Sequence, residues 1–169
     1  MLQYFRQHLL IVGKDPMSDE FSSPDELNIL KNKIDEWLQG RLNEISVIQS
    51  VDYDEEENRW YVRIQGEEKQ NYMLLMTSGQ RTLHFETYVM PAPEENEAKF
   101  YEHLLRRNQK LHGISFSIGT ENALYLSGDL KNHWISEENL DWMIGSIYAA
   151  IELSFKAALR IGFASRFHE

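Results

Sequence analysis

The sequence predicts an α+β fold, in which an antiparallel sheet of about five to six strands is covered by helices in the order helix, strand meander, helix, two strands, helix. Apolar residues recur at three- and four-residue intervals in 24–42 and 137–160, which is typical of amphipathic helices. Between 47 and 90 apolar residues alternate with polar ones, which is typical of strands. These alternating segments follow each other after short turns, so neighbouring strands are expected to run antiparallel.

Composition restricts the class of protein. With 169 residues, of which 42% are hydrophobic, the chain has the size and make-up of one globular domain. It contains no cysteine, which excludes disulfides and thiolate chemistry, and its apolar runs are too short to cross a bilayer. The net charge of −10 opposes binding to phosphate backbones and anionic lipids. We therefore expect a cytoplasmic protein without a cofactor that binds neither nucleic acid nor membranes.

The chain is expected to consist of a short extension and a single domain. Residues 1–22 show no sustained periodicity, because Asp15, Pro16 and Asp19 interrupt it. We expect them to form a mobile or loosely docked amino-terminal extension without a signal peptide. The domain is expected to cover 23–169.

Turn and capping residues mark the ends of the expected elements. The tetrapeptide Ser-Pro-Asp-Glu at 23–26 is a capping box that starts the first helix. A second helix is expected over 94–111, with glutamates at its positive end and arginines near its negative end. Ser136 precedes a long last helix at 137–160. Strands are expected at 47–54, 59–65, 71–77, 82–90, 114–118 and 123–128.

One face of the expected sheet mixes aromatic and charged side chains, as partner-binding surfaces do. Strand alternation places these residues opposite the apolar face. They are Tyr61, Arg63, His84, Glu86 and Tyr88. The alternative is an ordinary solvated face with cross-strand charge pairs.

The last helix carries two apolar stripes, although a helix with a solvated outer side needs only one. The second stripe contains Trp142, Ala149 and Leu153. It is either covered by the amino-terminal helix or forms the interface of a homodimer, the commonest soluble oligomer.

Three arginines form a candidate anion site. Arg106 and Arg107 can offer bidentate donors to a carboxylate or phosphate together with Arg81. The alternative is that they are helix-end charges, with Arg106 paired to Glu102. Asn108 lies on the apolar stripe of the second helix, and we interpret it as a structural latch that binds backbone groups rather than a ligand.

Catalytic motifs are lacking in the sequence. His84 and Glu86 share a strand face, a spacing that can hold a metal or form an acid–base pair, but the other histidines show no HExxH-like spacing. No serine stands in G-x-S-x-G, and the glycines form neither a phosphate loop nor a dinucleotide motif. We therefore expect no metal site and no enzyme.

Several stretches carry a resemblance to a known family. They are ENRWYVRIQGEEK (57–69), RTLHFETYVMPAPEEN (81–96), YEHLLRRNQKLHGISFSIG (101–119), YLSGDL (125–130) and IGFASRF (161–167). On these residues, the region from Asp25 to the carboxyl terminus resembles the YbjN-domain family of bacterial proteins, which have a type III secretion chaperone-like fold. The resemblance implies a sensory-transduction regulator or a chaperone-like protein, and related secretion chaperones form dimers that bind extended segments of partner proteins. It supplies no catalytic or ligand residue.

Three functions are compatible with the sequence. The first is a non-enzymatic, protein-binding or chaperone-like regulatory module that forms a homodimer and binds a protein or peptide partner. The second is a small-molecule sensor that holds an anionic metabolite with Arg81, Arg106 and Arg107. The third is an enzyme with an unrecognised site at His84 and Glu86.

Overall fold

The computed structural model describes residues 21–44 and 47–167. Three α-helices lie in this part of the chain, together with six strands and three short 3-10 turns. The helices are α2 (Pro24–Leu42), α3 (Glu97–Asn108) and α4 (Glu137–Gly162). The strands are β1 (Ile48–Asp54), β2 (Arg59–Gln65), β3 (Asn71–Ser78), β4 (Thr82–Met90), β5 (Ile114–Ile118) and β6 (Leu124–Lys131).

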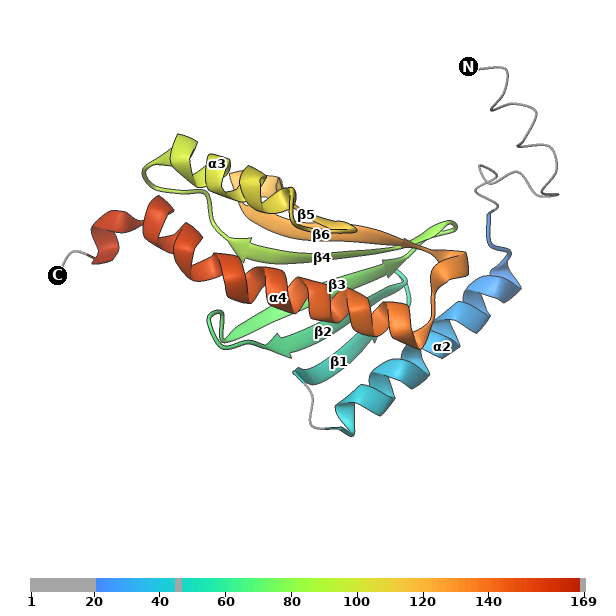
Figure 1. Cartoon of the computed structure of the whole chain (residues 1–169). Helices are drawn as coiled ribbons and strands as arrows, with labels where there is room; N and C mark the ends of the chain where they lie inside the picture. Colours follow the sequence, from blue (N-terminus) through green and yellow to red (C-terminus); the bar gives the residue numbers. More distant parts are fainter. Residues whose placement is uncertain (1–20, 45–46, 168–169) are drawn as a thin grey trace, which may run out of the picture.

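The six strands form one antiparallel sheet in the order β1-β2-β3-β4-β6-β5 (Figure 1). Sequence neighbours pair from β1 to β4, because each connection is a short turn. Helix α3 separates β4 from β5, and the last hairpin returns so that β6 lies beside β4 and β5 forms an edge. The α+β class and the order helix, meander, helix, two strands, helix are thus confirmed.

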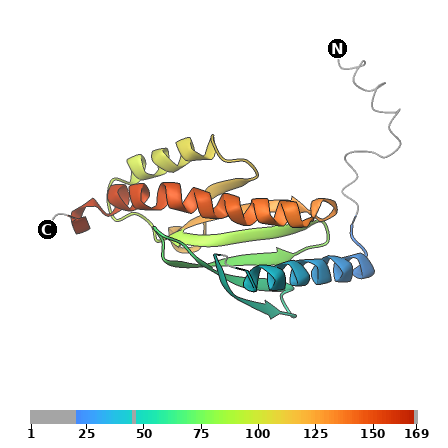
Figure 2. The same cartoon turned by 60° about the horizontal axis from the view of Figure 1, so that its bottom comes forward.

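The core lies between one face of the sheet and the helices (Figures 1 and 2). Helix α4 runs across the sheet, α2 lies near β1, and α3 packs beside α4 at the β5 edge. The buried apolar side chains of the strands alternate with the exposed ones, as the period of two requires. The inner face carries Trp60, Val62, Ile64, Leu74, Met76, Leu83, Phe85, Leu126 and Leu130.

Helix α2 begins and is anchored as its sequence predicts. The Ser23 hydroxyl accepts a hydrogen bond from the Glu26 amide, and the Glu26 carboxylate accepts one from the Ser23 amide at 2.7 Å, which completes the capping box. At the other end, Trp37 and Arg41 donate to the Asp141 carboxylate of α4 at 3.1 and 2.6–2.8 Å. These bonds attach α2 to the beginning of α4.

The expected start of α3 was wrong by three residues. Residues 94 and 95 form a bend, and both of their backbone N–H groups donate to the carbonyl of Gly162 at the end of α4. Asn96 then takes a left-handed conformation with φ of 53°, which the helix cannot continue through. The Glu94 carboxylate is bonded to Arg166 instead of facing a helix end. Helix α3 also ends earlier than expected, at Asn108.

The expected amino-terminal extension at 1–22 lies almost entirely outside the described residues. Its last residue, Ser22, donates its N–H to the Gln80 carbonyl at 2.8 Å and receives a bond from the Asn132 amide at 2.9 Å. Within the part of the chain that the structure describes, no helix is both long and apolar enough to cross a membrane.

Candidate functional site

The five side chains predicted on the outer sheet face do lie on one face. Strand pairing places Tyr61 opposite Leu75, and Leu75 opposite Glu86, so these three form a row across β2, β3 and β4. His84 and Tyr88 share the same side of β4, because they stand two residues from Glu86. The helices cover the opposite face, which leaves this one open to contact (Figure 1).

Apolar residues of β3 lie between the polar ones. Met73 pairs with Arg63, and Leu75 pairs with Tyr61, and both are half-buried on this outer face. The sequence reasoning missed them, because all of 72–76 is apolar and alternation cannot be read from it. The outer face is therefore an apolar strip of β3 flanked by aromatic and charged residues.

His84 is held between two carboxylates. Its Nδ1 lies 3.0 Å from an oxygen of Asp129 on β6, and its Nε2 lies 3.8 Å from an oxygen of Glu86. All three side chains are solvent-accessible, so water competes for each contact. Among the residues that the structure describes, no group of three or more His, Cys, Asp or Glu could hold a metal ion.

Tyr88 stands at the end of this face, next to the half-buried Lys69. Its ring meets the ring of Tyr125 edge-on at 5.7 Å between centroids. Lys69 donates to the carbonyls of Tyr88 and Val89 at 2.5 and 2.7 Å, and burial lowers the pKa of its ammonium group to about 8. No sequence pattern indicates this contact, because Lys69 follows two glutamates in a turn, where a solvated lysine is expected.

In the part of the chain that the structure describes, the second stripe of α4 is largely exposed. Trp142 is 43% exposed although its ring lies against Gly113, Leu153 is 65% exposed, and Ala149 is exposed between them. Among the described residues, no atom outside the helix's own backbone lies within 4 Å of where a Cβ would stand at Gly145. The alternative that the amino-terminal helix covers this stripe is wrong, since α2 attaches to α4 through Asp141 on another side.

The three arginines of the candidate anion site are engaged in separate contacts. Arg106 donates twice to Glu102 at 2.7 and 2.9 Å, and Arg107 donates to the Leu153 carbonyl at 3.1 Å. Arg81 lies in the β3–β4 turn, where its guanidinium carbon is 4.0 Å from the ring centroid of Phe21. The structure therefore brings Arg106 and Arg107 to one helix but does not bring Arg81 to them.

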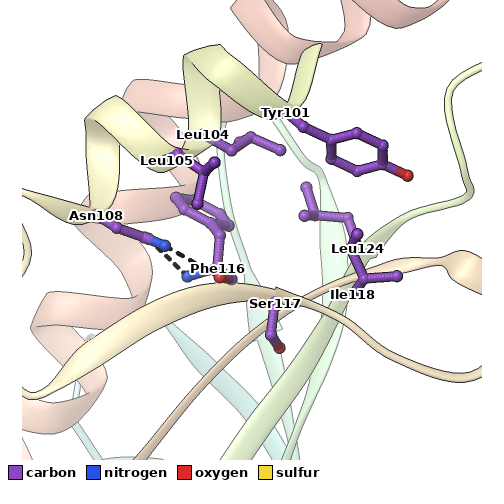
Figure 3. Close-up of a pocket in the computed structure, with 8 residues that line it drawn as sticks. All are labelled: Tyr101, Leu104, Leu105, Asn108, Phe116, Ser117, Ile118 and Leu124. Atoms are coloured by element: carbon purple, nitrogen blue, oxygen red, sulfur yellow. Dashed lines mark hydrogen bonds between the residues drawn. The ribbon is translucent and has the colours of Figure 1, made fainter. Parts of the chain in front are cut away.

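Asn108 joins α3 to the edge strand β5. Its amide nitrogen donates to the Phe116 carbonyl at 3.1 Å, and its amide oxygen accepts from the Phe116 N–H at 2.8 Å (Figure 3). The side chain is half-buried, so these two bonds satisfy groups that water reaches only in part. This geometry is what a latch between helix and strand requires.

A groove lies beside this latch, which the sequence reasoning did not predict. It has a volume of about 270 Å³ and lies between α3 and β5 (Figure 3). Its lining is apolar apart from Asn108, Ser117 and the Tyr101 hydroxyl. The other lining residues are Leu104, Leu105, Phe116, Ile118 and Leu124. No periodicity indicates it, because it depends on how α3 packs against a strand that follows it.

The fold and these surfaces define a small α+β domain that presents aromatic and apolar side chains to solvent outside its core. Residues 34–160 match the model of the YbjN family, described as "putative bacterial sensory transduction regulator". The chain belongs to the YbjN family, which confirms the resemblance seen in the sequence.

Curated relatives come from mycobacteria. The chain is 28% identical to an uncharacterised protein of Mycobacterium tuberculosis over 104 residues, which are 62% of this chain and 57% of that protein. It is 28% identical to an uncharacterised protein of Mycobacterium leprae over 107 residues, which are 63% of this chain and 58% of that protein. The match therefore spans less than two thirds of the length of these relatives.

Proposed function

We propose that this chain is a non-enzymatic, cytoplasmic regulatory module that binds another protein in a chaperone-like manner and works as a homodimer. The observation that carries the proposal is the uncovered stripe on α4, where Trp142 and Leu153 are 43% and 65% exposed. A helix that already buries a full apolar face against its sheet gains nothing from a second one in water. A second protein surface gives this stripe a role.

A second copy of the chain suits the stripe. Gly145 and Ala149 are small, so another helix can approach closely between Trp142 and Leu153. Aromatic residues are enriched at interface cores, and a twofold arrangement places the same patch on both subunits. The stripe is thus the proposed dimer interface.

The outer sheet face is the proposed partner-binding surface. It offers Tyr61 and Tyr88 as rigid amphipathic anchors and Leu75 as an apolar centre. Arg63, His84 and Glu86 supply the charged rim. The family description as a regulator supports a role in recognition over one in chemistry.

Capture of a partner by the tagged full chain tests this proposal. We expect a partner to co-elute with the chain at a fixed ratio from a bacterial lysate, and to be lost with the double variant Tyr61→Ala and Tyr88→Ala. The variant Glu36→Gln, at an exposed position of α2 on the opposite side of the sheet, is the matched control and should retain the partner. Equal retention by all three proteins would contradict the sheet face as the binding surface.

A thermal-shift series separates the sensor function from the proposed one. Ligands that bind only the folded chain raise its melting temperature. The separate contacts of Arg81, Arg106 and Arg107 give no reason to expect such a shift from anionic metabolites. A reproducible shift by one metabolite class, abolished by Arg107→Ala, would favour the sensor instead.

A further inference from the structure

Strand β5 lies at the edge of the sheet, and the backbone groups of its alternate residues Ile114, Phe116 and Ile118 face away from β6. Asn108 bonds both the N–H and the C=O of Phe116, so these groups point away from β6. Because strand residues alternate in direction, the backbone groups of Ile118 point the same way. No strand lies beyond β5 in the sheet, and within 21–44 and 47–167 nothing bonds these groups of Ile118.

The Asn108 amide shows what fits at this edge. It donates to one carbonyl and accepts from one N–H, as the peptide group of a neighbouring strand would do. Ile118 presents the next equivalent pair of groups along β5. A peptide group from another chain can take that position, and α3 blocks such pairing at Phe116.

The apolar groove opens beside Ile118. The side chains of Ile118 and Leu105 are 55% and 66% exposed, and both line it (Figure 3). Its volume of about 270 Å³ is slightly below the range of roughly 300–1,000 Å³ that small-molecule sites occupy. It therefore suits a single large side chain better than a cofactor.

The groove has an acidic residue beside it. Burial raises the pKa of the Tyr101 hydroxyl, and Glu97, one helical turn before it, raises that pKa further. Among the described residues Glu97 forms no ion pair, and no lysine or arginine lines the groove. A second copy of this chain brings the same acidic surface and a charge of −10, whereas a basic segment complements it.

We propose that the groove between α3 and β5 binds an extended segment of another protein, which pairs its backbone with Ile118, inserts one large aliphatic or aromatic side chain, and places a lysine or arginine near Glu97. Backbone pairing at a sheet edge gives affinity, and the groove gives side-chain selectivity. This inference rests on the proposed protein-binding function and adds a second contact surface to it.

Selection of short randomised peptides on the full chain tests the inference, followed by fluorescence anisotropy with the selected peptide. We expect the selected sequences to share one large apolar residue and an adjacent basic residue. Ile118→Pro removes the outward N–H without breaking a ladder bond, and Leu105→Asp places a charge in the groove. Each should weaken binding roughly tenfold or more, because one hydrogen bond or one apolar contact carries about that much affinity.

Two controls keep the outcome interpretable. Ile29→Asp changes an apolar residue of α2 that is exposed to the same degree as Leu105, and it should leave peptide affinity unchanged. Hydrogen exchange should show new protection of the Ile118 amide in the complex, while the Phe116 amide is already protected in the free protein by Asn108. Circular dichroism establishes that each variant is folded.

Three results would overturn the inference. Peptides that bind equally well to Ile118→Pro and Leu105→Asp use another surface, which leaves the proposed protein-binding function standing. A dimer of the full chain that dissociates with Leu105→Asp would make a second copy the occupant. Peptide binding that requires removal of residues 1–20 would make the chain's own segment the occupant.

Discussion

The side-chain amide of Asn108 and the backbone of Phe116 exchange two hydrogen bonds, of 3.1 and 2.8 Å, across the boundary between α3 and β5. This pair fixes the helix against the edge of the sheet. It also sets the width of the groove on one side, because Asn108 and Phe116 both line it.

Asn108→Ala is expected to lower the free energy of unfolding by about 2 kcal/mol, because two hydrogen bonds are lost and the half-buried backbone groups of Phe116 lose their partners. Urea denaturation measures the change, and hydrogen exchange should show a faster amide at Phe116. Gln109→Ala, at the exposed neighbouring position, should have little effect. Unchanged stability and unchanged exchange at Phe116 in Asn108→Ala would contradict the role of Asn108 as a latch between α3 and β5.

Gly128→Ala and Gly145→Ala are expected to have opposite effects on the free energy of unfolding of the monomeric chain, which the Leu153→Asp background supplies because it is expected to dissociate the proposed dimer. A Cβ at Gly128 would lie 2.2 Å from the Gly113 carbonyl oxygen and 2.9 Å from the Phe85 ring, so the backbone must move. We expect a loss of about 3 kcal/mol in the free energy of unfolding. A Cβ at Gly145 meets nothing within 4 Å, and alanine in a helix is favoured by about 1 kcal/mol.

Thermal and urea unfolding of the two glycine variants measure these effects. If the Gly128→Ala protein were as stable as the parent, the Gly113 backbone and the Phe85 ring would be able to move away from residue 128 without a loss of stability, which would contradict this prediction. In the parent chain Gly145→Ala should stabilise less than in the Leu153→Asp background, because the proposed dimer interface brings another helix close to Gly145. Destabilisation in the monomeric background would contradict the open position of Gly145.

The sequence was sufficient wherever a short-range pattern decides the structure. Strand alternation placed His84 and Glu86 on one face, and the limits of β2, β4 and β5 were predicted to the residue. Prediction from the sequence failed where contacts between distant segments decide the structure. Residues 94 and 95 read as a helix start, but the carbonyl of Gly162 binds both amides.

The candidate sites follow the same division. The helical spacing of Trp142 and Leu153 predicted that both lie on one stripe of α4. Whether that stripe is exposed depends on where α2 packs, which the spacing does not indicate. The groove beside Ile118 and the half-buried position of Lys69 arise from packing between segments far apart in the sequence, so no local pattern could predict them.

Lys69 should make stability depend on pH in the alkaline range. Its folded pKa is lowered to about 8 by burial, whereas the unfolded value is near 10.5. The folded chain therefore releases the proton first, and the free energy of unfolding should rise between about pH 8 and 10, by up to about 3 kcal/mol. Below pH 8 the ammonium form is present in both states and this gain is absent.

Lys69→Met should remove this rise, whereas Lys156→Met changes an exposed lysine paired with Glu68 and should leave it in place. Urea denaturation at a series of pH values measures both slopes. The comparison between variants is needed because the pKa of Tyr72 is raised by burial, and its ionisation lowers stability at the alkaline end of the series. Equal slopes in the parent and Lys69→Met would contradict the assignment.

The central claim is that the outer stripe of α4 is a protein-contact surface, and the mass of the full chain in solution tests it most directly. Sedimentation velocity over a range of concentrations should give about 40 kDa, twice the chain mass of 20.0 kDa. Leu153→Asp should shift the protein to 20.0 kDa while it remains folded, because a charge in the interface loses its solvation. A parent chain that stays monomeric at 20.0 kDa at every concentration would contradict the claim.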